Sequence, residues 1–180
     1  ADFHGIRVLV QGVGHVGFNL CKILHAAGAE LIVADISAAN LRRVQASLPV
    51  TVVGVEDLVA EEADIYAPCA LGAVLNDDTI PILKADIVAG AANNQLAGLQ
   101  HGEALRQRGI LYAPDYVVNS GGIINVWSEM KSLPKESVCD KISRIYDITL
   151  RILREADEQG TSSNLVADEM ALALIQGKAA

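Results

Sequence analysis

Residues 6–17 read IRVLVQGVGHVG, and the organisation of the whole chain can be worked out from this stretch. Ile6 to Val10 is an apolar run broken only by Arg7, which is typical of a strand buried on both faces. Gly12-Val13-Gly14-His15-Val16-Gly17 follows at once. Its three glycines permit a tight turn, a close approach of backbone to a ligand, and close packing of a helix on the strand. Apolar residues at helical spacing up to Ala27 then predict a helix over 15–27.

The position of this glycine motif, between a strand and a helix, indicates a dinucleotide site. The free N–H groups at the start of the helix are suited to a diphosphate. A second strand, Leu31–Ala34, ends at Asp35, 18 residues after Gly17. A carboxylate there is expected to accept hydrogen bonds from ribose hydroxyls and to repel a 2'-phosphate, which favours NAD over NADP. The alternatives are an empty glycine turn and, for Asp35, an acid that only stabilises the next helix.

Short apolar runs alternate with helical patterns through the first two thirds of the chain. Further strands are expected at 51–53, 65–67, 87–89 and 110–113. This alternation predicts an α/β fold, a Rossmann-type doubly wound parallel sheet with extra C-terminal helices. We assign all of residues 1–180 to one NAD-binding domain, with the sheet in roughly 1–120 and the helices in 121–180.

From Gly121-Gly122 onward the sequence predicts helices and no further strand. From Ile123 to Met130 the apolar residues fall on one helical face, and a second stripe runs from Pro134 to Gly160. A last helix is expected through Leu165 and Ile175. These helices contain no internal repeat.

Composition narrows the classes of partner. Asp and Glu outnumber Lys and Arg by 22 to 14, giving a formal charge of −8, which argues against a binder of nucleic acid or of an anionic membrane. The longest charge-free stretch, 87–102, is interrupted by polar residues, so no membrane span is expected. The wide spacing of Cys21, Cys69 and Cys139 fits neither a metal site nor a disulfide framework, and we expect no metal and a reduced, cytoplasmic chain.

Three later loops follow predicted strands, at 68–72, 90–95 and 114–122. Ligands of open parallel sheets bind outside the carboxyl ends of the strands, so these loops are expected to line the nicotinamide half of the site. Asn93 and Asn119 offer both a donor and an acceptor to a carboxamide or a small polar substrate. Either could instead be a turn residue in the left-handed conformation. Cys69 lacks a nearby His in sequence, which favours a buried structural thiol over a nucleophile.

With these motifs in place, the chain resembles the leucine, phenylalanine and valine dehydrogenases, the amino-acid dehydrogenases related to glutamate dehydrogenase. The matching text is GVGHVG, LIVADI, DIYAPCALGAVLNDDTI, VAGAANNQL and HGEALRQRGILYAPDYVVNSGGIINV. CALGAVLNDDTI and NNQL are most similar to the members that act on leucine. The resemblance implies reversible NAD-dependent oxidative deamination of leucine or another branched-chain amino acid to the 2-oxo acid and ammonia.

The resemblance also assigns residues to the cofactor and the substrate. It implies that Gly12, Val13, Gly14, His15, Val16 and Gly17 hold the pyrophosphate, with His15 offering only its backbone. Asp35 and Ile36 would hold the adenosine ribose, and Cys69 and Ala70 the middle of the cofactor. Ala91, Ala92, Asn93 and Asn119 would lie beside the nicotinamide, with Asn93 also at the substrate. Ile123 and Val126 would shape a pocket for an aliphatic side chain.

One feature of that family is not found in this chain. Its members supply the general base and the carboxylate anchor as lysines and an aspartate on a separate N-terminal domain. None of the six lysines here, at 22, 84, 131, 135, 141 and 178, is expected in a loop at the cofactor site, so no catalytic residue is assigned. We therefore expect this chain to be the cofactor half of a two-domain enzyme. It is expected to be inactive alone, and the full-length enzyme is expected to be a homo-oligomer. The chain also departs from the family at Trp127, where the family has a small residue.

Several alternatives stay open at this point. The chain could belong to a phenylalanine or valine dehydrogenase, since a methylene or two in a pocket is worth only about 1–3 kcal/mol. It could also be a dinucleotide-sensing module without chemistry, which would leave the asparagine loops unexplained. A methyltransferase that uses S-adenosylmethionine fits the glycine spacing less well.

Overall fold

Within residues 2–177, the part of the chain that the computed structural model describes, six parallel strands form one sheet. Its order is β3-β2-β1-β4-β5-β6, which is doubly wound: the chain moves outward from β1 to one edge, then returns to β4 and moves to the other. The predicted fold is confirmed, and no strand end differs from its predicted position by more than one residue. The strands are β1 Arg7–Gln11, β2 Glu30–Ala34, β3 Val50–Val52, β4 Ile65–Pro68, β5 Ile87–Val88 and β6 Leu111–Tyr112.

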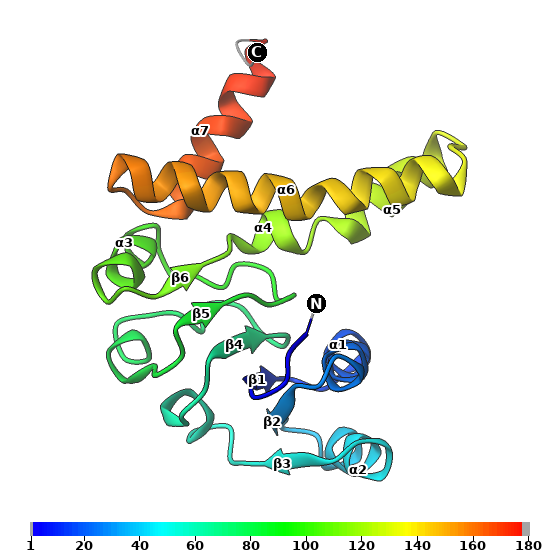
Figure 1. The fold of residues 1–180 in the computed structure, drawn as a ribbon, viewed down its shortest axis with the longest axis vertical. Helices are drawn as coiled ribbons and strands as arrows, with labels where there is room; N and C mark the ends of the chain where they lie inside the picture. Colours follow the sequence, from blue (N-terminus) through cyan, green and yellow to red (C-terminus); the bar gives the residue numbers. More distant parts are fainter. Residues whose placement is uncertain (1, 178–180) are drawn as a thin grey trace.

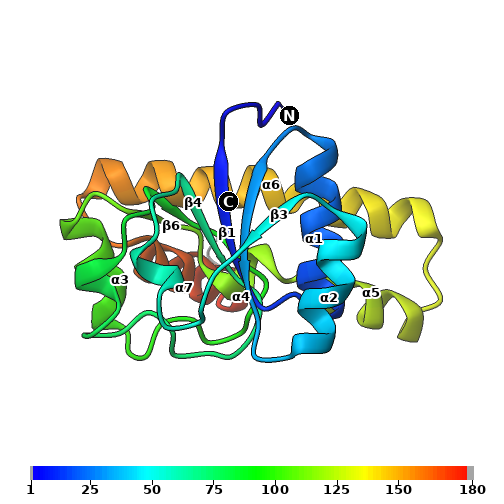
Figure 2. The same cartoon turned by 90° about the horizontal axis from the view of Figure 1, so that it is seen from below.

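Helices cover both faces of the sheet. Figure 2 shows α1 (His15–Ala26) and α2 (Ala38–Ser47) on one face and α3 (Gln100–Gln107) on the other. The segments after β3 and β4 contain only single 3-10 turns, η1 (Leu58–Ala60) and η2 (Ile80–Ile82). The Ser37 hydroxyl accepts a hydrogen bond from the Asn40 N–H at 3.4 Å and so caps the start of α2.

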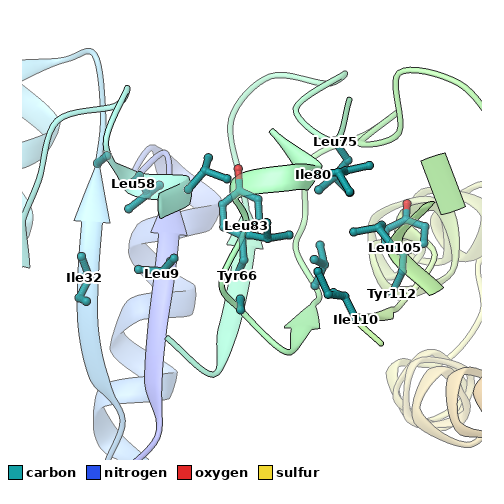
Figure 3. Close-up of a cluster of buried hydrophobic side chains, with 14 residues drawn as sticks. Leu9, Ile32, Leu58, Tyr66, Leu75, Ile80, Leu83, Leu105, Ile110 and Tyr112 are labelled. Carbon is teal, nitrogen blue, oxygen red and sulfur yellow. The ribbon is translucent and has the colours of Figure 1, made fainter. Parts of the chain in front are cut away.

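Side chains alternate between two apolar cores because successive residues of a strand point to opposite faces. In β1, Val8 and Val10 pack with Cys21 of α1 and Val44 of α2. Leu9 packs on the opposite face, in the cluster drawn in Figure 3, which joins η1, η2 and α3 to the sheet. The central strands are therefore buried on both faces, as their continuous apolar runs predicted.

The C-terminal helices lie beyond β6, at one end of the sheet (Figure 1). They are α4 (Asp115–Val118), α5 (Gly121–Met130), α6 (Lys135–Gln159) and α7 (Ser163–Ile175). A third apolar cluster, built on Ile152, Ala156, Val166 and Ala167, joins α6 to α7, with Val117 of α4 packed against it. No helix among residues 2–177 is long and apolar enough to cross a membrane.

The prediction for one loop is wrong. Residues 114–122 were predicted as a loop, whereas 115–118 form α4 and α5 begins at Gly121. A helix of four residues is too short to show a 3.6-residue period, and its apolar residues therefore give no helical signal. Asp115 in its first turn is an acid at the position that a helix start favours.

Candidate functional site

The glycine loop (Gly12–Gly17) lies where β1 and its neighbour β4 end, at the point where the strand order reverses. Gly12 has a φ of +89°, and a Cβ there would approach the Ala70 Cβ at 2.7 Å. A Cβ on Gly17 would meet the Gly12 carbonyl oxygen at 1.9 Å. The fold itself therefore requires both glycines. Gly12 is needed for its backbone conformation, and Gly17 is needed because α1 lies against the loop.

Gly14 differs from these two glycines. Its φ is −62°, and a Cβ built on it would have no protein atom within 4 Å among the described residues. It is the N-cap of α1, where no side chain caps the helix and no acid occupies the first turn. The Gly14 residue thus leaves open space beside amide groups that lack a side-chain acceptor, which is the arrangement that binds an anion such as a diphosphate.

Asp35 follows β2 and holds the glycine loop. Its Oδ2 accepts hydrogen bonds from the Val13 N–H at 2.8 Å and from the Asn40 side chain at 3.1 Å, and its Oδ1 accepts one from the Ser37 N–H at 2.7 Å. A carboxylate can accept about four hydrogen bonds, so capacity remains for a ligand hydroxyl. Because the Ser37 N–H belongs to the N-cap of α2, Asp35 fills the alternative role, an acid that stabilises the start of a helix, while its role at the ribose stays a prediction. Beside it, Ile36 is 91% exposed.

Hydrogen bonds connect the loops along this edge of the sheet. The Cys69 N–H donates to the Gln11 carbonyl at 2.7 Å, and the Ala92 N–H donates to the Pro68 carbonyl at 2.8 Å. The structure therefore brings the 69–70 loop against the glycine loop and the 91–93 loop against the 69–70 loop. These are the segments to which the resemblance assigned the successive parts of one extended cofactor.

Asn93 and Asn119, which come from different loops, meet at this edge. The Asn119 Nδ2 donates to the Asn93 Oδ1 at 2.6 Å. This pairing leaves the amide nitrogen of Asn93 and the amide oxygen of Asn119, a donor and an acceptor, to bind a ligand. The left-handed turn conformation applies to neither residue: it is Asn94, with φ of +54°, that adopts it.

These two side chains line a hollow, which we call the asparagine hollow. Ile123 of α5, 72% exposed, belongs to it. Val126 lies one turn further along α5 and is 56% exposed. Trp127 of α5 is 46% exposed, and the Lys141 ammonium lies over its ring at 5.4 Å. The lining residues of the hollow are Ala91, Asn93, Tyr116, Asn119, Ser120, Gly122 and Ile123.

Sequence reasoning missed the side chains that support this hollow. The buried Gln95 donates to the Gly90 and Ala92 carbonyls at 2.8 and 3.0 Å. The buried Asp115 accepts from the Asn94 N–H at 2.7 Å and from the Tyr112 hydroxyl at 2.6 Å, and burial raises the pKa of Tyr112. No local signal separates Gln95 from Asn93 and Asn94 before it, because its burial, which requires hydrogen-bond partners for the amide, is set by the packing of the loop.

Cys69 is a structural thiol by its surroundings. Its side chain packs with the apolar cluster that contains Cys21. Burial raises the pKa of the Cys69 thiol, and it raises the pKa of Cys21 to about 11. Because only the thiolate is a good nucleophile, this environment suppresses reactivity. All three cysteines are free thiols.

The known proteins that this chain resembles in sequence and in structure are amino-acid dehydrogenases. The model of the glutamate/leucine/phenylalanine/valine dehydrogenases matches residues 35–177. Leucine dehydrogenase of Bacillus subtilis is 46% identical over 94% of this chain and 47% of its own length. The crystal structure of L-tryptophan dehydrogenase from Nostoc punctiforme superposes with a TM-score of 0.94 at 44% identity, covering 98% of this chain and 54% of that one.

A more distant structure shares the fold alone. The hetero-hexameric glutamate dehydrogenase from Thermus thermophilus is 23% identical, with a TM-score of 0.75 over 99% of this chain and 48% of that chain. The chain thus spans about half the length of the relatives it matches.

Proposed function

This chain belongs to the glutamate, leucine, phenylalanine and valine dehydrogenase family, and from that premise we propose that it is the NAD-binding part of an amino-acid dehydrogenase. The observation that carries the proposal is Gly14. Packing and backbone conformation explain Gly12 and Gly17, but neither requires a glycine at position 14. A diphosphate lying in the open space against Gly14 supplies the reason.

The residues present fit an extended dinucleotide. The first-turn amides of α1 would bind the diphosphate, and Asp35 with the exposed Ile36 would hold the adenosine ribose. The donor and acceptor left by Asn93 and Asn119 match a carboxamide. A dinucleotide held by these residues would supply the acceptor for the hydride that leaves the substrate α-carbon.

NAD is the proposed cofactor rather than NADP because of Asp35. Its carboxylate is fixed by three hydrogen bonds, so it cannot swing away from a 2'-phosphate without losing them. A repulsion of about 1.4 kcal/mol corresponds to a tenfold preference.

The proposed reaction is the oxidative deamination of an amino acid with an apolar side chain. Ile123 presents apolar surface beside Asn93 in the asparagine hollow, which supports a branched-chain substrate such as leucine. The relatives include both a leucine and an L-tryptophan dehydrogenase, and phenylalanine and valine remain alternative substrates.

The proton transfers of the reaction are assigned to no residue of this chain. Among residues 2–177, no lysine lines the asparagine hollow or the neighbouring hollow around Leu99, and Lys178 lies outside the described residues. The proposal therefore gives this chain the binding and orientation of the cofactor. Self-association of the full-length protein is part of the proposal, and a cytoplasmic location stays a prediction.

Calorimetric titration and kinetics of the complete gene product test the proposal. We expect NADH to bind at least tenfold more tightly than NADPH, and reduction of NAD with leucine to exceed that with phenylalanine or tryptophan. Gly14→Ala should weaken NADH binding at least tenfold with the fold intact, because the new methyl group fills the space against the diphosphate. Failure of the wild-type protein to bind either dinucleotide would overturn the function itself.

The same measurements separate the dinucleotide-sensing alternative. A sensing module would bind NADH yet reduce no NAD with any amino acid. The paired Asn93 and Asn119 favour the enzyme, because the donor and acceptor that they leave lie at one end of the proposed dinucleotide path, beside an apolar wall that a sensor does not need.

A further inference from the structure

Arg43 reaches the glycine loop from the neighbouring helix. It lies in the second turn of α2, 29 residues beyond Gly14 in sequence. Its Nη2 donates to the Val13 carbonyl at 2.6 Å and to the Gly14 carbonyl at 3.0 Å. One guanidinium nitrogen thus bridges two successive peptide groups of the loop.

These two peptide groups carry the amides that the proposed diphosphate needs. In a planar trans peptide the carbonyl and the following N–H point in opposite directions. A cation that binds the Val13 and Gly14 carbonyls therefore directs the Gly14 and His15 N–H groups away from itself. Among the described residues neither N–H has a backbone acceptor or a side-chain cap, so both are available to an anion.

The Arg43 guanidinium is itself held in place. It lies over the Phe18 ring at 4.5 Å, a cation–π arrangement. The Phe18 N–H also donates to the Gly14 carbonyl at 3.1 Å, as the first hydrogen bond of α1. Phe18 therefore ties the guanidinium and the start of the helix together, with the Gly14 carbonyl between them.

Asp35 holds the same loop from the other direction, through the Val13 N–H at 2.8 Å. Val13 is thus bound at both its amide and its carbonyl, and the loop has little freedom to rotate its peptides. Preorganised donors bind an anion more tightly because no ordering cost remains to be met on binding.

We propose that Arg43 is a positioning residue for the cofactor: it aligns the Gly14 and His15 amides toward the diphosphate without contacting the ligand. This role deepens the proposed function and rests on it. A cation on the two carbonyls also polarises the peptides, which makes their N–H groups stronger donors.

A different role for Arg43 makes a different prediction. An arginine close to the adenosine ribose can bind a 2'-phosphate directly. In that case its removal would weaken the binding of NADPH and leave NADH binding unchanged. Alignment of the diphosphate amides affects both dinucleotides equally, since both carry the same diphosphate.

The test is calorimetric titration of the complete gene product with NADH and NADPH, in wild type, Arg43→Met and Arg42→Met. Arg42 is the matched control: it is the adjacent exposed arginine of α2, so its loss changes the net charge equally. We expect Arg43→Met to weaken both dinucleotides about tenfold and Arg42→Met to weaken neither. Loss of NADPH binding alone, unchanged binding in Arg43→Met, or an equal effect of Arg42→Met would overturn the proposal.

Two further readouts guard against a purely structural effect. We expect Arg43→Met to raise the KM for NAD about tenfold while kcat stays within twofold, because the aligned amides bind the diphosphate and not the reacting carbon. Arg43→Lys, which keeps a donor for the carbonyls, should recover part of the affinity. A fall in kcat with unchanged KM would also refute the role. If wild type bound no dinucleotide, the proposed function would fail first, which distinguishes the two failures.

Discussion

The glycine loop and the asparagine hollow lie at the same edge of one sheet, yet they are built in different ways. The glycine loop is one continuous segment, Gly12–Gly17, that presents backbone amides and open space. The asparagine hollow joins side chains from the loop after β5 to α4 and α5. The first depends on residues that lack side chains, and the second depends on buried polar side chains that hold separate loops together.

The largest effect is expected for Gly17→Ala, which tests whether close backbone packing builds the glycine loop. The new Cβ would lie 1.9 Å from the Gly12 carbonyl oxygen, so α1 must move away from the strand. We expect the free energy of unfolding to fall by about 3 kcal/mol, measured by urea denaturation. The matched change Gly14→Ala should cost at most about 1 kcal/mol, the difference between Gly and Ala at an N-cap. Equal losses would contradict the distinction drawn between the two glycines.

Asp115→Asn tests whether a buried polar side chain holds the asparagine hollow together, again by urea denaturation. The amide cannot accept from both the Asn94 N–H and the Tyr112 hydroxyl, so one buried donor is left without a partner. We expect a loss of about 2 kcal/mol in unfolding free energy. Asp168→Asn is the control, because this carboxylate accepts from the more exposed Tyr116 hydroxyl, and less than about 1 kcal/mol should be lost. A larger effect at Asp168 would show that the buried contact is not what supports the hollow.

Asp35→Ala sharpens the comparison by asking what the glycine loop recognises. We expect NADH binding to weaken and the preference for NADH over NADPH to fall about tenfold, since both the ribose acceptor and the charge that repels a 2'-phosphate are removed. Titration with the two dinucleotides measures both quantities. An unchanged preference would leave Asp35 with only its role of holding the Val13 N–H.

The smallest effect concerns the buried thiol behind the glycine loop. Burial raises the pKa of Cys21 from 9.0 to about 11, so the thiol stays protonated in the folded protein while it ionises near its ordinary pKa in the unfolded chain. Its contribution to stability is therefore complete below pH 9 and is lost as the pH rises toward 11. Between pH 9 and 10, unfolding free energy should fall about 1 kcal/mol more in wild type than in Cys21→Ala. Parallel pH profiles would rule this out.

By itself, the sequence determined the fold and the glycine loop. The doubly wound parallel sheet follows from apolar runs separated by helical crossovers, and the position of Gly12, Gly14 and Gly17 between a strand and a helix marks the glycine loop. Such signals are local, because a strand, a tight turn and a helix start are each set by a few consecutive residues. The short helix α4 was missed for the same reason: four residues carry no period.

Only the tertiary structure decided how the remaining residues come together. The sequence identified Asn93 and Asn119 singly, but their hydrogen bond, and the one that the buried Asp115 accepts from the Asn94 N–H, join residues distant in the chain. The contact between Arg43 and the glycine loop is of the same kind. Buried polar groups need partners, and which partner each one finds is fixed by how the helices and loops pack, which no local pattern of residues records.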